Sequence, residues 1–341
     1  MEQHQLPYRE RVSMKLQILV PHWQETREEM EPLLDSLAIQ QAVNLREVGV
    51  IVAYDGDEAS ALPVDEWARK YPFAIEHVHA RKGGVSATRN AALDAATADY
   101  VMFCDADDMF FHACALHVIF NEIALGFDTL VSSFIEETRH PETKQPLFID
   151  HQTDSTFVHG KVHRRGYLVD NGIRFNDALT VHEDSYFNIL CQNLTQNAKY
   201  CAQPFYLWKW RDTSVCRHDP DYILKTYNNM LDSNDALVCE FERRGRHDKA
   251  LFYTAFMVMD AYYTMNKREW LDKTHADYRE AVERRFSKYY ADHKAQWEEV
   301  SDADRMMISN GVRQRSVMEG MPMESITIDA WLDHIQEKKA N

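Results

Sequence analysis

Three aspartates crowd the end of one apolar segment. Residues 100–103 read Tyr-Val-Met-Phe, the pattern of a buried strand, and Asp105, Asp107 and Asp108 follow directly. Carboxylates this close repel one another unless a cation lies among them. Their hard oxygens suit Mg²⁺ or Mn²⁺, which bind phosphate oxygens in turn. The spacing therefore indicates either a divalent-metal site at Asp105 and Asp107 or a solvated acidic turn.

A glycine pair opens the helical segment that precedes this strand. The sequence from residue 82 to 96 is KGGVSATRNAALDAA, so Gly84 and its neighbour allow close backbone approach to a ligand. The helix then presents its N-terminal amides, which favour anions. Arg89 and Asn90 lie one turn further on, where they could reach a diphosphate or ribose. The alternative is an ordinary helix start with Arg89 in solvent.

Further candidate residues lie downstream. Glu183 and Asp184 precede a helical segment, residues 185–192, where they are either catalytic acids or simply stabilise the first turn. Lys161 follows a glycine and either meets a phosphate, pairs with an acid or is solvated. His218 is either an additional metal ligand or a structural histidine.

The elements that would position these residues alternate between strand and helix. Apolar strand patterns alternate with helical periodicity through the first two hundred residues, which predicts an α/β fold with a mostly parallel, doubly wound sheet. Such sheets bind ligands at the carboxyl ends of their strands, where Pro21 and Asp55 also lie. The strands are expected at residues 16–20, 48–53, 73–78, 100–104 and 129–134.

The pattern changes at about Asp219. From there helical periodicity replaces the strand signals, which predicts a domain boundary between residues 1–218 and 219–341. Residues 251–263 are apolar nearly all round, as in the central helix of a bundle. Residues 306–324 contain glycines and a proline and are expected to form a loop.

Composition limits the classes of function. The 341-residue chain carries a formal charge of -16, which argues against a nonspecific grip on nucleic-acid backbones. Its six cysteines are scattered without C-x-x-C pairs, as expected in a reducing compartment. The N-terminus lacks the apolar core of a signal peptide, and no run is long enough for a membrane span. A cytoplasmic location is therefore expected.

Taken together, these segments resemble the family 2 glycosyltransferases with the GT-A fold. The main matching motifs are G-x-S-x-x-R-N, the alanine-rich helix after it and D-A-D-D. Further segments match in the same order as in the family: LQILVPHWQE, VIVAYDGDE, HGKVHRRGYL, VHED and YLWKWRDTSVCR. The resemblance spans residues 16–217. It implies a GT-A domain with a C-terminal all-helical extension, and an inverting, metal-dependent transfer of a sugar from a nucleotide-sugar donor, UDP-linked in most members.

The resemblance also implies residue roles. Asp184 would be the catalytic base, with Glu183 in reserve, and Asp107 the principal metal ligand, aided by Asp105 and His218. Asp55 would hold the nucleobase, Asp108 would reach the sugar, and Mn²⁺ or Mg²⁺ together with Arg89 would neutralise the departing diphosphate. The full set expected to bind the nucleotide sugar is Pro21, Asp55, Gly84, Arg89, Asn90, Asp105, Ala106 and Lys161.

The chain departs from the family pattern around the expected nucleobase pocket. His22-Trp23-Gln24 replaces the usual Thr-Tyr-Asn, Tyr54 replaces the first acid of an Asp-Asp pair, and Thr88 replaces an alanine. The metal residues follow the pattern more closely than the pocket does.

Two other functions and several partners stay open. A nucleotidyltransferase would need a glycine-rich loop after the first strand, where this chain has Pro-His-Trp-Gln. A GT-A-like binding or scaffold protein without activity is the non-enzymatic alternative, although all the expected acids are present. The acceptor could be a glycan, a lipid-linked molecule, a protein or a modified nucleic-acid base. The helical segment could shape the acceptor site or mediate a homodimer.

Overall fold

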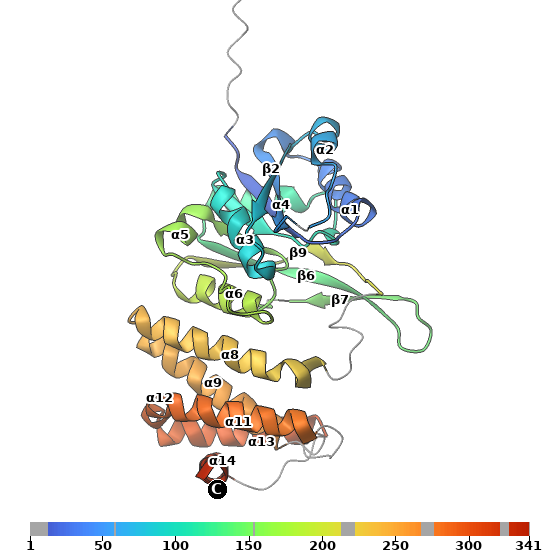
Figure 1. The fold of residues 1–341 in the computed structure, drawn as a ribbon. Helices are drawn as coiled ribbons and strands as arrows, with labels where there is room; N and C mark the ends of the chain where they lie inside the picture. The colour runs from blue at the N-terminus through green and yellow to red at the C-terminus, as the bar shows by residue number, and fades with distance from the viewer. Residues whose placement is uncertain are drawn as a thin grey trace, which may run out of the picture. The chain divides into compact units, whose positions relative to one another are not determined.

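The computed structural model describes residues 13–57, 59–152, 154–212, 222–266, 276–320 and 327–340 (Figure 1). The chain divides into two compact units, residues 1–212 and 213–341. The boundary predicted between His218 and Asp219 lies outside the described residues and stays a prediction.

The first unit is built on one sheet, whose strands run in the order β3-β2-β1-β4-β8-β6-β9-β5, with β7 beside β6. Four strands pair in parallel as the sequence predicts: Leu16 of β1 lies opposite Val48 of β2 and Tyr100 of β4, and β3 continues from β2. The strands are β1 (Leu16–His22), β2 (Val48–Asp55), β3 (Ala74–Ala80), β4 (Tyr100–Phe103), β5 (Met109–Phe110), β6 (Thr129–Arg139), β7 (Pro146–His151), β8 (Lys161–Arg164) and β9 (Ala198–Trp208).

The other half of the sheet is mixed. β8 is antiparallel to both β4 and β6, β6 is parallel to β9, and β5 and β7 are antiparallel to β9 and β6. The α/β fold with helices in the C-terminal part is thus confirmed, but a continuous parallel arrangement runs only from β3 to β4, and β6 and β9 form a separate parallel pair. The short strand β8, Lys-Val-His-Arg, has too few apolar residues to give a strand signal in the sequence.

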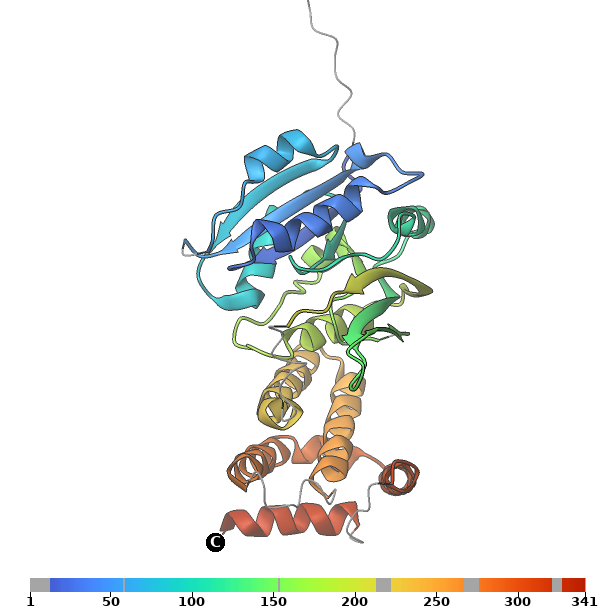
Figure 2. The same ribbon diagram turned by 90° about the vertical axis from the view of Figure 1, so that its right-hand side faces the viewer.

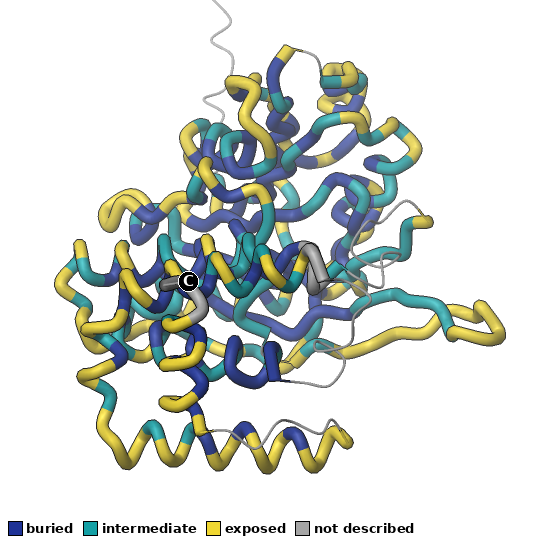
Figure 3. The backbone as a smooth tube through the Cα atoms, turned by 60° about the horizontal axis from the view of Figure 1, so that its bottom comes forward, coloured by how far each residue is buried: buried dark blue, intermediate teal, exposed yellow. Residues whose placement is uncertain are grey.

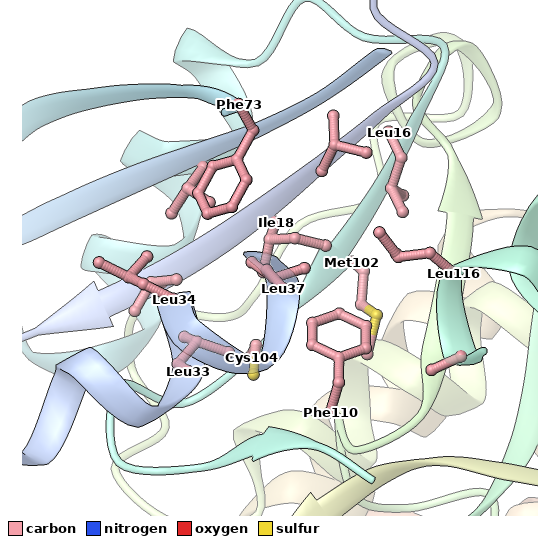
Figure 4. Packing of buried hydrophobic residues seen from close by; sticks show 14 of the residues in the cluster. Leu16, Ile18, Leu33, Leu34, Leu37, Phe73, Met102, Cys104, Phe110 and Leu116 are labelled. Carbon is pink, nitrogen blue, oxygen red and sulfur yellow. The ribbon is translucent and has the colours of Figure 1, made fainter. Parts of the chain in front are cut away.

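Six α-helices accompany the sheet in the described part of the first unit, and α1 illustrates how they are fixed. Thr26 and Glu29 form a reciprocal capping box at its start, since each side chain accepts the other's backbone N–H. Leu33, Leu34 and Leu37 then face Leu16, Ile18 and Met102 of the sheet, where all are buried (Figure 4). These helices are α1 (Arg27–Ala38), α2 (Val64–Lys70), α3 (Gly84–Ala95), α4 (Ala115–Leu125), α5 (Arg165–Asp170) and α6 (Glu183–Asn193).

The second unit is helical and has its own core. α9 packs against α8, α12 and α13, and α11 packs against α8 and α14 (Figure 2). The buried residues of α9 confirm the predicted central helix. The expected loop over residues 306–324 is wrong for its first part, because α13 continues to Met318. The helices are α8 (Tyr222–Arg243), α9 (His247–Met265), α11 (Ala276–Asp292), α12 (Lys294–Glu299), α13 (Asp302–Met318) and α14 (Ile328–Ala340).

Burial alternates along most of these helices (Figure 3). The hairpin of β6 and β7 is exposed on β7, where Leu147, Phe148 and Ile149 all face solvent. Among the described residues, none of the helices combines the length and hydrophobicity needed to cross a bilayer.

Truncating the core of the first unit should destabilise it strongly. Leu34 has no exposed surface, so Leu34→Ala removes buried methyl groups and leaves a cavity, at a cost of about 3 kcal/mol in the free energy of unfolding. The matched variant Leu125→Ala alters a side chain that is 72% exposed and should change stability by less than about 0.5 kcal/mol. Urea unfolding followed by circular dichroism measures both. Equal effects of the two variants would contradict the packing of α1 described above.

Candidate functional site

The candidate site lies at the carboxyl ends of β1, β2 and β4. Because the three strands are parallel and in register, with Leu19 opposite Phe103 and His22 opposite Tyr54, their ends share one edge of the sheet. Pro21 of β1 pairs with Ala53, two residues before Asp55 at the end of β2. Asp105 follows β4 at the same edge. The strands therefore bring together the three segments that the sequence singled out.

Asp55 fastens the start of α3. Its carboxylate accepts the backbone N–H of Gly83 at 3.0 Å and that of Gly84 at 3.2 Å. Gly84 has φ +78°, a left-handed conformation that favours glycine. The amides predicted to receive a phosphate thus have a carboxylate of the chain itself as acceptor. For Gly84 to bind a phosphate, this bond with Asp55 has to open.

Arg89 is the centre of the site. This side chain of α3 is 5% exposed, donates from Nη2 to Asp105 Oδ1 at 3.0 Å and from Nη1 to Glu183 Oε1 at 2.9 Å. Its guanidinium carbon lies 5.2 Å from the centre of the Phe175 ring. Burial alone would lower the pKa of Arg89, but the neighbouring carboxylates outweigh it and raise that pKa. The alternative of a solvated Arg89 is therefore wrong.

The acids after β4 differ in environment. Asp105 keeps 32% of its side chain exposed, and although burial raises its pKa, the guanidinium of Arg89 outweighs that and holds the pKa below its usual value. Asp107 is 18% exposed and accepts a hydrogen bond from Arg211 at 2.5 Å. Burial and the charge of Asp105 raise the pKa of Asp107. Ala106, between them, is buried in the core.

Asp108 turns away from this edge. It is 1% exposed and accepts hydrogen bonds from the hydroxyl of Tyr206 and the backbone N–H of Lys209. Burial raises its pKa well above the usual value. Both oxygens are used by β9 and the residue after it, so Asp108 fixes the turn and does not reach outward to a sugar as the sequence suggested.

His159 is a site residue that the sequence reasoning missed. Ligand atoms of Asp105, Asp108 and His159 all lie within 4.8 Å of one another. The ring is 3% exposed and stacks on Tyr206, and its Nδ1 is buried without a hydrogen-bond partner. Burial lowers the pKa of His159 to about 3, so its imidazole is neutral. The sequence offered one signal for His159: it begins the segment His-Gly-Lys, of which only Lys161 was predicted to be a site residue.

This set of donors fits a divalent cation. The carboxylate of Asp105 and the neutral imidazole of His159, with its unused ring nitrogen, are ligands for Mn²⁺ or Mg²⁺, and Asp107 adds a second carboxylate in the same turn. Asp108 lies beside them, but both of its oxygens already accept hydrogen bonds. The remaining predicted ligand, His218, lies outside the described residues.

The two acids that begin α6 have different surroundings. Glu183 is bound to Arg89, whereas Asp184 accepts the N–H of Ser185 at 2.8 Å and has no side-chain hydrogen-bond partner within the described part of the chain. Burial, with a further contribution from the charge of Glu183, raises the pKa of Asp184 to about 7. A carboxyl with this pKa exchanges protons near neutrality, as a general base requires.

Lys161 and Asn90 are both buried. The ammonium of Lys161 donates to the carbonyl of His159 at 3.2 Å, and burial lowers its pKa to about 8 against the opposing charges of Asp154 and Asp184. The amide of Asn90 bonds both backbone groups of Phe175 and the side chain of Asp177. Asn90 therefore holds the loop before α6 and does not face the sheet edge that was expected to bind the donor.

These features match a known family. Residues 17–161 fit the model described as Glycosyl transferase family 2. This stretch is therefore similar to family 2 glycosyltransferases. The uncharacterized glycosyltransferase EpsJ of Bacillus subtilis is 24% identical over 204 residues, covering 54% of this chain and 58% of EpsJ. The uncharacterized glycosyltransferase YibD of Escherichia coli is 25% identical over 228 residues, covering 60% of this chain and 63% of YibD. The chain thus spans about three fifths of these curated relatives.

Solved structures share the fold. Residues 1–349 of S. aureus TarS are 16% identical, cover 96% of this chain and 91% of that chain, and give a TM-score of 0.58. TarS has also been solved with UDP-GlcNAc. The mannosyltransferase PcManGT from Pyrobaculum calidifontis, solved with GDP-Man and Mn²⁺, is 14% identical over 95% of this chain and 84% of that chain, with a TM-score of 0.50. The expected architecture, a GT-A fold with helices in the C-terminal part of the chain, is thereby confirmed.

The buried carboxyl of Asp184 should cost stability at alkaline pH. Its pKa is higher in the folded chain, about 7, than the ordinary 3.8, so the folded state holds the proton more tightly. Stability therefore falls as pH rises from about 4 to 7. Asp184→Asn removes this penalty and should melt at a higher temperature than the natural chain at pH 8, with the difference vanishing below pH 4. Thermal unfolding across this pH range measures it.

The control is Asp57→Asn, which changes the same chemistry at a fully exposed side chain. It should leave the pH dependence of the melting temperature unchanged. A melting temperature for Asp184→Asn that stays below that of the natural chain at pH 8 would mean that the charged Asp184 is stabilised in the fold.

Proposed function

We propose that this chain is a metal-dependent, inverting glycosyltransferase that moves a sugar from a UDP-linked donor to an acceptor hydroxyl. The observation that carries the proposal is the buried pair of contacts from Arg89 to Asp105 and Glu183. One guanidinium ties the acidic edge, where a metal and diphosphate would lie, to the start of α6, where the base would lie. The match to the family model and the GT-A fold support the same reaction class.

The metal part of the proposal rests on the donor set. Asp105 and Asp107 would hold Mn²⁺ or Mg²⁺, with His159 close to Asp105. When bound, the cation would neutralise negative charge on the diphosphate leaving group. Arg89 adds a permanently charged group that is already oriented by two carboxylates, so little reorganisation is needed during the reaction. PcManGT, of the same fold, was solved with Mn²⁺ and GDP-Man.

Asp184 is the proposed general base. With a pKa of about 7 it is partly deprotonated at neutral pH and can take the proton from an acceptor hydroxyl. That oxygen would attack the anomeric carbon opposite the diphosphate, and a single displacement inverts the configuration. Glu183 is the weaker candidate because its carboxylate is paired with Arg89.

The donor's nucleobase would lie near the ends of β2 and β3. Tyr54 stacks on His79 with ring centroids 4.9 Å apart, and His22 meets the edge of Tyr54 at 5.1 Å. The exposed ring of His79, supported by the buried Tyr54, offers a surface for a planar base near Asp55. Uracil is proposed because it is the usual base in the family, and TarS of this fold was solved with UDP-GlcNAc. The acceptor and a homodimer through the helical unit stay predictions.

Replacing the base should abolish turnover without removing the donor. Asp184→Asn keeps the size and the hydrogen bond to Ser185 but cannot accept a proton, so kcat should fall roughly 10²–10⁴-fold. The natural chain should gain activity as pH rises to about 7, since Asp184 must be deprotonated. Hydrolysis of UDP-sugars with added Mn²⁺ measures both, and calorimetry with UDP checks that binding is kept.

Asp94→Asn is the matched control, because Asp94 is an exposed α3 residue paired with Arg174. It should retain nearly full activity. Unchanged turnover in Asp184→Asn would refute the assignment of the base. A sugar product with retained anomeric configuration would refute inversion, and UDP binding without turnover for any donor would favour a binding protein.

A further inference from the structure

Arg211 occupies the carboxylate that the metal is expected to use. It lies just after β9, and its Nη1 meets Asp107 Oδ2 at 2.5 Å. Its Nη2 also lies 3.4 Å from Glu29 Oε1 on α1. Arg211 is 33% exposed and Arg89 only 5%, so the guanidinium of Arg211 is far more accessible, although Asp107 at 18% is less exposed than Asp105 at 32%.

A cation and a guanidinium compete for Asp107. Both are attracted by the same negative charge, and the hydrogen bond from Arg211 takes up acceptor capacity on Oδ2 that a metal ion could otherwise use. Asp105 keeps its contact with Arg89 and has part of its side chain open to solvent. Asp107 is thus the carboxylate at which a cation competes with an accessible guanidinium.

We propose that Arg211 is an exchangeable counter-ion, which neutralises Asp107 until a divalent cation displaces it. This inference rests on the proposed function, because it takes the metal to bind Asp107. Glu29 offers the displaced guanidinium a second carboxylate, so the side chain can leave Asp107 without losing every partner. A guanidinium also matches a phosphate well. A cation that arrives with a diphosphate therefore gives Arg211 a new anion, and a cation alone does not.

The first test is Mn²⁺ binding to the full-length chain without nucleotide, measured by calorimetry. Arg211→Gln removes the competitor and should tighten Mn²⁺ binding about tenfold, the size expected for losing one charge-assisted hydrogen bond. Glu29→Gln should weaken Mn²⁺ binding several-fold, because the displaced guanidinium of Arg211 then loses a carboxylate that can receive it. Glutamine can keep the capping box of α1, so the helix start is preserved.

The matched control is Arg46→Gln. Arg46 is exposed in the turn before β2, at the opposite end of the sheet from Asp107, so the variant makes the same change in net charge away from the site. Its Mn²⁺ affinity should equal that of the natural chain. Arg211→Lys keeps the charge and should stay close to the natural chain, and it serves with Glu29→Gln if Arg211→Gln does not fold.

The second test repeats the titration with saturating UDP. UDP should tighten Mn²⁺ binding more in the natural chain than in Arg211→Gln, because only the natural chain gains a new partner for Arg211. Weaker or unchanged Mn²⁺ binding by Arg211→Gln without UDP, or the same affinity for Arg211→Gln and Arg46→Gln, would overturn the exchange. Asp107→Asn separates the two proposals: if it binds Mn²⁺ as the natural chain does, the metal site of the proposed function fails.

Discussion

The site depends on a positive charge kept out of water. Arg89 is buried among Asp105, Glu183 and the ring of Phe175, and its two hydrogen bonds join α3, the turn after β4 and the start of α6. A guanidinium in such surroundings is costly to bury without partners, and breaking a pair of this kind typically costs 3–5 kcal/mol because a charge is left uncompensated. The three elements are therefore held in one arrangement by the same interaction that sets the charges of the site.

The acids of the site differ in their surroundings, and this gives them different pKa values. Arg89 keeps Asp105 ionised, whereas Asp184, one residue beyond the carboxylate that Arg89 binds, is left to burial and has its pKa raised to about 7. Two carboxyls near one arginine thus receive opposite shifts, which allows one to serve a cation and the other a proton. The raised pKa of Asp184 means that the folded chain binds this proton more tightly, and the same shift lowers the stability of the fold once the proton is lost.

The sequence predicted the parts of the fold that have a local signal. The strands β1, β2 and β4 are continuous apolar runs, and α3 follows its glycines, so the edge with Asp55 and Asp105 followed from them. β8 was missed because four residues with two charges carry no periodicity, and α13 because Gly311 and its neighbouring polar residues look like a loop. The inward turn of Asp108 could not be predicted, and the segment HGK gave only a weak signal for His159, since the placement of both residues depends on Tyr206, which is distant in the chain.

The two arginines of the site differ in burial more than in chemistry. Arg89 and Arg211 each face an aspartate of the same turn, but Arg89 is closed off by Phe175 and two carboxylates, and Arg211 is one-third exposed at the end of a strand. In a poorly solvated place an ion pair is hard to break, because no water replaces the lost partner. Near the surface, water and other ions can replace it at small cost. The same pairing therefore makes a fixed support at Asp105, whose arginine is buried, and a replaceable one at Asp107, whose arginine is accessible.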